Sequence, residues 1–139
     1  MNIRLLPALL MMPLVLAAGP AEAAWRCRNP DLEVGCSGGR CEATVGEGFT
    51  PMDIVFAEDG SVDACVYSGC WIGQGQVAGD DRYLSLWLRE AEFAPQINEE
   101  PVRGELALLL DRQEGVATLM FAAFVQPLVC QRTRTDAAD

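Results

Sequence analysis

Alternation of apolar and polar side chains is the most regular feature of this sequence. Over residues 82–89 every second side chain is a leucine (Leu84, Leu86 and Leu88), which is typical of a half-buried strand. A helix capped by Asp80 or Asp81 is the alternative for residues 82–93, because leucines and an alanine also recur there at helical spacing. We favour the strand, because leucines two residues apart would lie on different sides of a helix.

The same period recurs on both sides of this segment. Residues 52–57 alternate, Glu58-Asp59-Gly60-Ser61 has the composition of a hairpin turn, and residues 62–67 resume the strand pattern. A glycine-rich strand is expected over residues 71–77, where Gly73 and Gly75 would let a curved strand bend.

The segments nearer the two ends are less regular. Residues 102–110 and 116–125 predict a last hairpin with a turn at 111–115, and both arms are almost continuously apolar, as in strands buried on both faces or in a helix. Residues 25–41 predict an irregular lead-in held by cysteines, residues 94–101 a loop, and residues 131–139 a frayed tail.

Together these segments predict about six or seven strands joined by consecutive hairpins. The expected fold class is all-β, a small antiparallel meander that forms a barrel or sandwich. No repeat or linker divides the sequence, so residues 24–139 are expected to form a single domain.

Residues 1–23 resemble a secretory signal peptide. Arg4 supplies the positive charge, residues 5–16 form an apolar run, and Ala21-Glu22-Ala23 matches the small-x-small pattern that a signal peptidase cleaves. The run is shorter than a membrane-spanning helix of about 20 residues, so no stable membrane insertion is expected after cleavage. We therefore expect a secreted or periplasmic protein, and the arginine- and alanine-rich composition favours a bacterial source.

All six cysteines follow the predicted cleavage site, and an even number of cysteines in a small exported chain predicts disulfides. Two pairs flank short Ser-Gly segments, which suits a tight loop closed by its own bridge. The favoured pairing is Cys27–Cys130, Cys36–Cys41 and Cys65–Cys70, with exchange between the two short loops as the alternative. A zinc site is not expected, because the chain has no histidine and no C-x-x-C pair.

Composition excludes several kinds of chemistry. All ten cationic residues among the 139 are arginines, so the chain has neither the histidine of a catalytic triad nor the lysine of a phosphate-binding loop. A net charge of −10 makes nucleic acid an unexpected partner. Asp59, Ser61 and Asp63 begin like a calcium loop, but the glycine and glutamate that would complete the loop are absent. No cofactor or metal is expected.

Aromatic and arginine side chains mark the candidate binding site. If the leucines of residues 82–89 fill the core, then Tyr83, Trp87 and Arg89 point the other way. Trp71, in a neighbouring strand, and Tyr67 beside it could extend this patch. Tyrosine, tryptophan and arginine are the residue types that anchor protein interfaces. The alternative is that a loop or the lead-in covers these side chains and makes them a second small core.

The excess of acidic residues predicts the charge of a protein partner. An excess of carboxylates attracts basic proteins and speeds their encounter, although it also serves solubility alone. We therefore expect a non-enzymatic binding module for a basic protein. The alternatives are a carboxylate-dependent hydrolase of envelope glycans, for which no pair of acids stands out, and a purely structural envelope protein.

Overall fold

The computed structural model describes residues 23–95 and 103–134, and every regular element in these ranges is a strand. No helix there is long and apolar enough to cross a membrane. The strands, in chain order, are β1 (Ala23–Arg28), β2 (Leu32–Ser37), β3 (Arg40–Val45), β4 (Asp53–Ala57), β5 (Ser61–Val66), β6 (Gly69–Gln74), β7 (Gln76–Gly79), β8 (Tyr83–Pro95), β9 (Arg103–Asp111), β10 (Val116–Phe121) and β11 (Phe124–Arg134).

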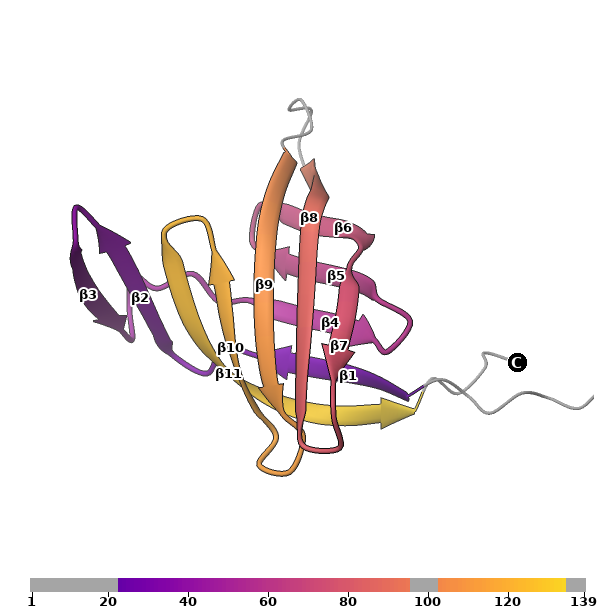
Figure 1. Ribbon diagram of the computed structural model, residues 1–139. Helices are drawn as coiled ribbons and strands as arrows, with labels where there is room; N and C mark the ends of the chain where they lie inside the picture. The colour runs from indigo at the N-terminus through magenta and orange to yellow at the C-terminus, as the bar shows by residue number, and fades with distance from the viewer. Residues whose placement is uncertain (1–22, 96–102, 135–139) are drawn as a thin grey trace, which may run out of the picture.

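Eight of the strands close into an antiparallel barrel (Figure 1). Its order is β1-β4-β5-β6-β8-β9-β10-β11, and the pairing of β1 with β11 completes the ring. The short strand β7 continues β6 beyond a break at Gly75 and pairs with the first half of β8. The expected all-β class is confirmed, and the barrel rather than the sandwich is the architecture.

Leucine side chains from the long strands fill the interior of the barrel. Those at alternate positions of β8 and β9 are almost completely buried, which confirms the strand at residues 83–89 and excludes the helix. They pack against apolar residues of β1, β4, β10 and β11. The largest fully buried side chains are Ile54, Phe56, Leu84, Leu86, Leu88, Leu110, Leu119 and Leu128.

The β2–β3 hairpin projects from the barrel as an extension of β11. Only Phe124 and Val125 of β11 pair with β2, and β3 pairs with β2 alone among the described strands. The hairpin turn is Gly38-Gly39, where φ values of 58° and 77° favour glycine.

Buried polar side chains fasten this hairpin to the barrel. The Gln126 side chain of β11 accepts a hydrogen bond from Asn29 Nδ2 (3.0 Å) and donates one to Glu33 Oε2 of β2 (3.0 Å). The Thr50 backbone N–H also donates to Glu33 (3.4 Å). The side chains of Asn29, Glu33 and Gln126 are almost completely buried. Because each of them forms a hydrogen bond with another member of the cluster, the cluster stabilises one position of the hairpin.

All six cysteines form the favoured disulfides. Cys27–Cys130 joins directly opposed residues of β1 and β11, and therefore locks the seam where the barrel closes. Cys36–Cys41 and Cys65–Cys70 each lock a hairpin across opposed residues. Three disulfides are consistent with an extracellular or periplasmic location.

Several sequence-based expectations about the ends of the chain are wrong. Residues 25–41 are not an irregular lead-in, because they form β1, β2 and the start of β3. The cysteines of this segment bridge neighbouring strands rather than irregular loops. The tail predicted from residue 131 starts too early, because β11 continues to Arg134 opposite β1. Ala23, the residue before the predicted cleavage site, is the first residue of β1, and the cleavage site itself stays a prediction; residues 1–22 and 135–139 lie outside the described residues.

The last hairpin also differs from the expectation. Residues 116–125 are not one arm, because the chain turns at Ala122, where φ is 49°, and begins β11. The apolar arms are not buried on both faces: Leu109 and Met120 are exposed while their neighbours Leu108 and Leu119 are buried. Residues 94 and 95, predicted to start a loop over 94–101, belong to β8, and the rest of that range lies outside the described residues.

Candidate functional site

The outer surface of the barrel carries an apolar row that crosses six strands. Cross-strand pairing puts six uncharged side chains directly beside one another, from β8 through β9, β10, β11 and β2 to β3: Trp87, Ala107, Met120, Val125, Val34 and Ala43. Directly paired residues point to the same side of a sheet, so the row is continuous from the barrel onto the projecting hairpin.

A second row runs parallel to the first across the four barrel strands. It consists of Ser85, Leu109, Thr118 and Pro127. Beyond it lie the exposed side chains of Tyr83, Val116 and Val129. We call these two rows and three side chains the uncharged face.

Large hydrophobic side chains are exposed on the uncharged face. Leu109 is 53% exposed, Met120 56% and Trp87 48%, although ordinary folding would bury such side chains. A groove of about 410 Å³ lies along Leu109, Val116 and Val129 and is bordered by Asp111. Another of about 500 Å³ lies along Trp87 and Met120 and is bordered by Arg103 and Glu105. Exposed apolar side chains that lie next to one another, with polar residues around them, mark interaction sites, so this surface is a candidate interface.

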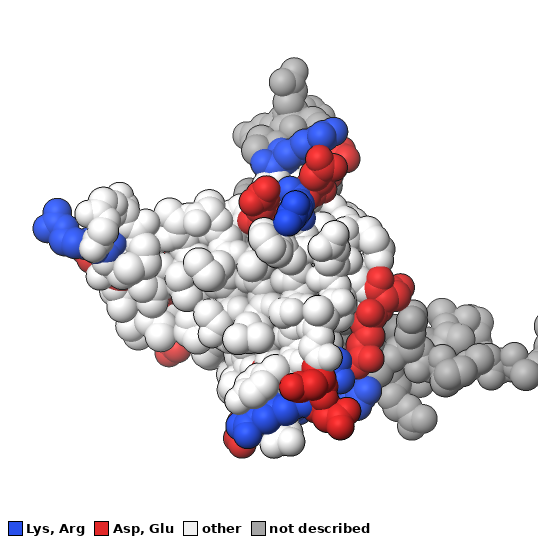
Figure 2. Space-filling model, in the orientation of Figure 1, with Lys and Arg blue, Asp and Glu red and all other residues white. Residues whose placement is uncertain are grey.

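Charged residues gather at the margins of this face. Figure 2 shows a white centre with blue and red atoms along the edges. At one end Arg82 donates hydrogen bonds to Asp111 (3.1 Å) and stacks over the Tyr83 ring (5.1 Å). At the other end the Arg89 guanidinium lies 4.5 Å from the centroid of the Trp87 ring. An apolar centre with a polar rim is the usual composition of a protein interface.

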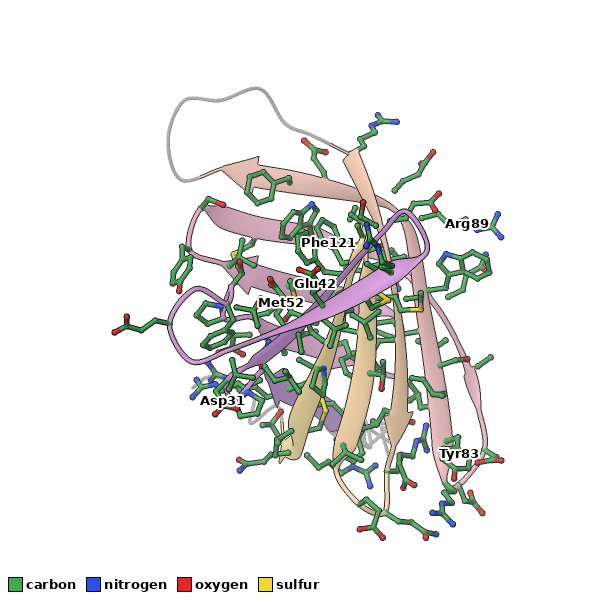
Figure 3. All side chains as sticks on the ribbon, turned by 90° about the vertical axis from the view of Figure 1, so that its left-hand side faces the viewer. Asp31, Glu42, Met52, Tyr83, Arg89 and Phe121 are labelled. Carbon is green, nitrogen blue, oxygen red and sulfur yellow. A yellow bond between two sulfur atoms is a disulfide. The ribbon has the colours of Figure 1, made fainter. Side chains whose placement is uncertain are left out.

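Three of the five predicted site residues, Tyr83, Trp87 and Arg89, lie on β8 with exposed side chains. Arg89 contacts Trp87, whereas Figure 3 shows Tyr83 at the opposite end of the strand from Arg89. Tyr67 is 69% exposed, but it belongs to the turn between β5 and β6 and lies outside the uncharged face.

Trp71 does not extend the patch. It pairs with Ala64 and Phe93, both of which point into the barrel, and its ring packs against Phe93 (4.5 Å between centroids) and Phe121 (4.3 Å). This aromatic cluster closes one end of the barrel interior. The expectation for Trp71 is therefore wrong, because the pleat of β6 places residues 71 and 73 inward and Ile72 outward.

Sequence reasoning missed most of the uncharged face. The sequence pattern places Leu109, Val116 and Met120 in arms expected to be strands buried on both faces or a helix, and it makes no assignment for Val129. Their signal was available in principle, because each alternates with a buried neighbour. That alternation is hidden, however, because the inward and outward positions are both apolar.

Carboxylates with shifted pKa values lie outside the uncharged face or at its margin. Hydrogen bonding from Arg26 lowers the pKa of Asp53, and backbone N–H groups lower the pKa values of Asp59 and Asp80. Burial raises the pKa of Asp111, but bonds from the N–H groups of residues 114 and 113 and from Arg82 bring it below its ordinary value. The groups that lower these four pKa values are arginines and turn N–H groups of neighbouring residues, so each carboxylate is engaged in contacts within the fold.

One cluster has the composition of a metal site. The Asp63 carboxylate lies within 4.8 Å of the sulfurs of Cys65 and Cys70. Both sulfurs belong to a disulfide and are not thiolates, so they cannot act as thiolate ligands. Asp59 and Ser61, which begin like a calcium loop in sequence, form a turn in which the Ser61 N–H donates to the Asp59 carboxylate (2.8 Å).

Comparisons with known proteins assign no function. No family model, no curated protein and no solved structure matches the chain.

Proposed function

We propose that this protein is a non-enzymatic binding module that uses the uncharged face to bind a basic protein. The observation that carries the proposal is the row from Trp87 to Ala43, six outward side chains without a charge in a chain whose net charge is −10. Six strands spaced by about 4.8 Å give this row a span of about 24 Å, which suits a protein surface better than a small ligand.

The distribution of charge supports a basic partner. The centre of the face offers apolar contacts, and the excess of carboxylates over the whole chain attracts a cationic protein during its approach. The disulfides, together with the predicted signal peptide, support a setting outside the cytoplasm.

The test is binding to lysozyme, a small basic protein, with α-lactalbumin as an acidic counterpart of similar size. Isothermal titration calorimetry at low salt is expected to detect binding of lysozyme and none of α-lactalbumin. The affinity is expected to fall as salt is added, because ions screen the attraction. If lysozyme and a second basic protein, cytochrome c, both fail to bind at low salt, the proposal is wrong.

A pair of variants tests the face itself. Leu109→Asn removes an apolar contact from the centre of the uncharged face and is expected to weaken binding about tenfold, equivalent to about 1.4 kcal/mol. Ile72→Asn is the matched control, because Ile72 is 52% exposed but lies on β6, outside the face. Equal losses in the two variants would contradict a role for the uncharged face.

A further inference from the structure

Strand β3 is an exposed sheet edge. Among the described residues it pairs only with β2, and Figure 1 shows it at the outer limit of the projecting hairpin. In Figure 3 the hairpin, with Glu42 labelled, lies in front of the barrel with no strand beyond it. A strand edge of this kind can pair with another chain.

Two hydrogen bonds establish which backbone groups of β3 point outward. The Cys36 N–H donates to Ala123 O (2.7 Å), toward β11, so Cys36 and Cys41 form a pair without mutual hydrogen bonds. The Gly46 N–H donates to Asp31 O (3.2 Å), which gives the same alternation from the other end of the hairpin. The N–H and C=O groups of Cys41, Ala43 and Val45 therefore point away from β2.

Protection of this edge is weak at its centre. Natural sheets protect edges with charged side chains, above all lysine, with proline, with a bulge or with very short length; β3 has six residues, a regular register and no proline, and its two charges, Arg40 and Glu42, lie toward the turn and leave residues 43–45 uncharged. The Cys36–Cys41 bridge and the Asn29–Gln126–Glu33 hydrogen bonds hold the hairpin in place. A partner strand would therefore meet a preorganised template.

The antiparallel register centred on Ala43 pairs the largest number of outward groups within the two strands. If Ala43 lies opposite Ala43 of a second copy, the outward groups of residues 41, 43 and 45 all find partners. In this register Glu42 faces Thr44 of the second copy. A shift by two residues toward the turn would place Glu42 opposite Glu42, and like charges directly opposite one another are unfavourable.

We infer that the protein forms a two-fold dimer through antiparallel pairing of β3 with β3 of a second copy, centred on Ala43. The apolar row from Trp87 to Ala43 then continues across the dimer axis into the row of the second copy. Each dimer presents two uncharged faces on one continuous sheet. Because two six-residue strands form an interface smaller than the usual 1,600 Å² or so, dissociation is expected at micromolar concentrations.

The test is sedimentation equilibrium of the full chain over a wide range of concentration. The wild type is expected to show a monomer–dimer equilibrium. Ala43→Pro is expected to raise the dissociation constant more than about tenfold, because proline has no N–H to donate to the second copy while the bonds to β2 remain. Ala43→Thr keeps the N–H and is expected to keep the dimer. Thermal unfolding of dilute samples checks that both variants fold.

Hydrogen exchange locates the contact. The amides of Cys41, Ala43 and Val45 are expected to exchange more slowly as concentration rises, while that of Glu42, already bonded to β2, stays constant. Increasing salt is expected to tighten the dimer, because it screens repulsion between two chains of charge −10. This trend is opposite to that expected for a basic partner, so the two proposals can fail separately.

Two results would overturn the dimer. One is a monomer at every concentration up to about 1 mM, because a dimer with a dissociation constant of about 1 mM, or about 4 kcal/mol of association free energy, would be detected there. The other is a dimer that persists in Ala43→Pro and dissociates in Leu109→Asn, which would mean that two uncharged faces pack against each other instead.

Discussion

At the scale of single residues, ion pairs brace the outer surface of β1 against β4. Asp53 of β4 accepts hydrogen bonds from Arg26 (2.6 Å) and Arg28 (3.1 Å) of β1. These contacts lower the pKa of Asp53, so the folded state holds its proton less tightly than the unfolded chain does.

The consequence is a stability that depends on pH. Because the pKa of Asp53 is lower in the folded state, its contribution is complete above about pH 4, the ordinary pKa of aspartate, and is lost as the pH falls through the folded value. Asp53→Asn is expected to lower the urea midpoint slightly at pH 7, and the difference from wild type should shrink as the pH falls below about 4. Urea titrations at several pH values measure this. A difference that stayed constant down to pH 2 would contradict the ion-pair explanation.

At the scale of strands, lack of space explains the glycines of β6 and the break before β7. A Cβ at Gly75 would lie 2.7 Å from Leu86 Cδ1 and 3.1 Å from the Trp87 carbonyl oxygen, and one at Gly73 would lie 2.9 Å from Leu88 Cδ1. The leucines of β8 thus occupy the volume that side chains of β6 would need. The glycines allow close packing across the barrel, in addition to the bending that the sequence predicts.

Substitution at Gly75 tests this explanation. Gly75→Ala is expected to lower the free energy of unfolding by about 1–3 kcal/mol, because the methyl group meets Leu86 and backbone. Gly35→Ala is the control: its Cβ would meet only the Phe124 ring, at an ordinary 3.7 Å, so little change is expected. Denaturant unfolding compares the two. Equal effects would mean that backbone flexibility, not space, accounts for glycine at position 75.

Some strands and their buried sides could be predicted from the sequence, and others could not. The alternation over residues 82–89 is sufficient to predict a strand and its buried side, because only one side of that strand is aliphatic. The turn at Ala122-Ala123 carries no glycine, asparagine or proline, so the chain looked continuous there. The side on which Trp71 lies was hidden because glycines at 73 and 75 remove the apolar contrast of β6. The aliphatic outer positions of β9 and β10 concealed most of the uncharged face.

At the scale of the whole molecule, the three disulfides differ in how much of the chain they close. Cys27–Cys130 links residues 103 positions apart, whereas each of the other two links residues five apart. In the loop-entropy model, stabilisation grows with the length of the closed loop.

This difference predicts an order of stability. Replacing Cys27 and Cys130 by alanine is expected to lower the free energy of unfolding by about 4–5 kcal/mol, and replacing Cys36 and Cys41 by about 2 kcal/mol. Denaturant unfolding of the two double variants makes the comparison. Equal losses would show that local strand pairing, rather than chain entropy, dominates the effect of these bridges.

The seam between β1 and β11 has a consequence for engineering the chain. Ala23 lies directly opposite Arg134, so the outer ends of the first and last strands are neighbours. A circular permutant, with these ends fused by a short linker and new termini opened between Gln113 and Glu114, is therefore expected to preserve every strand. Such a permutant would place both new termini, and any tether attached to them, in the β9–β10 turn, on the opposite side of the chain order from the β2–β3 hairpin.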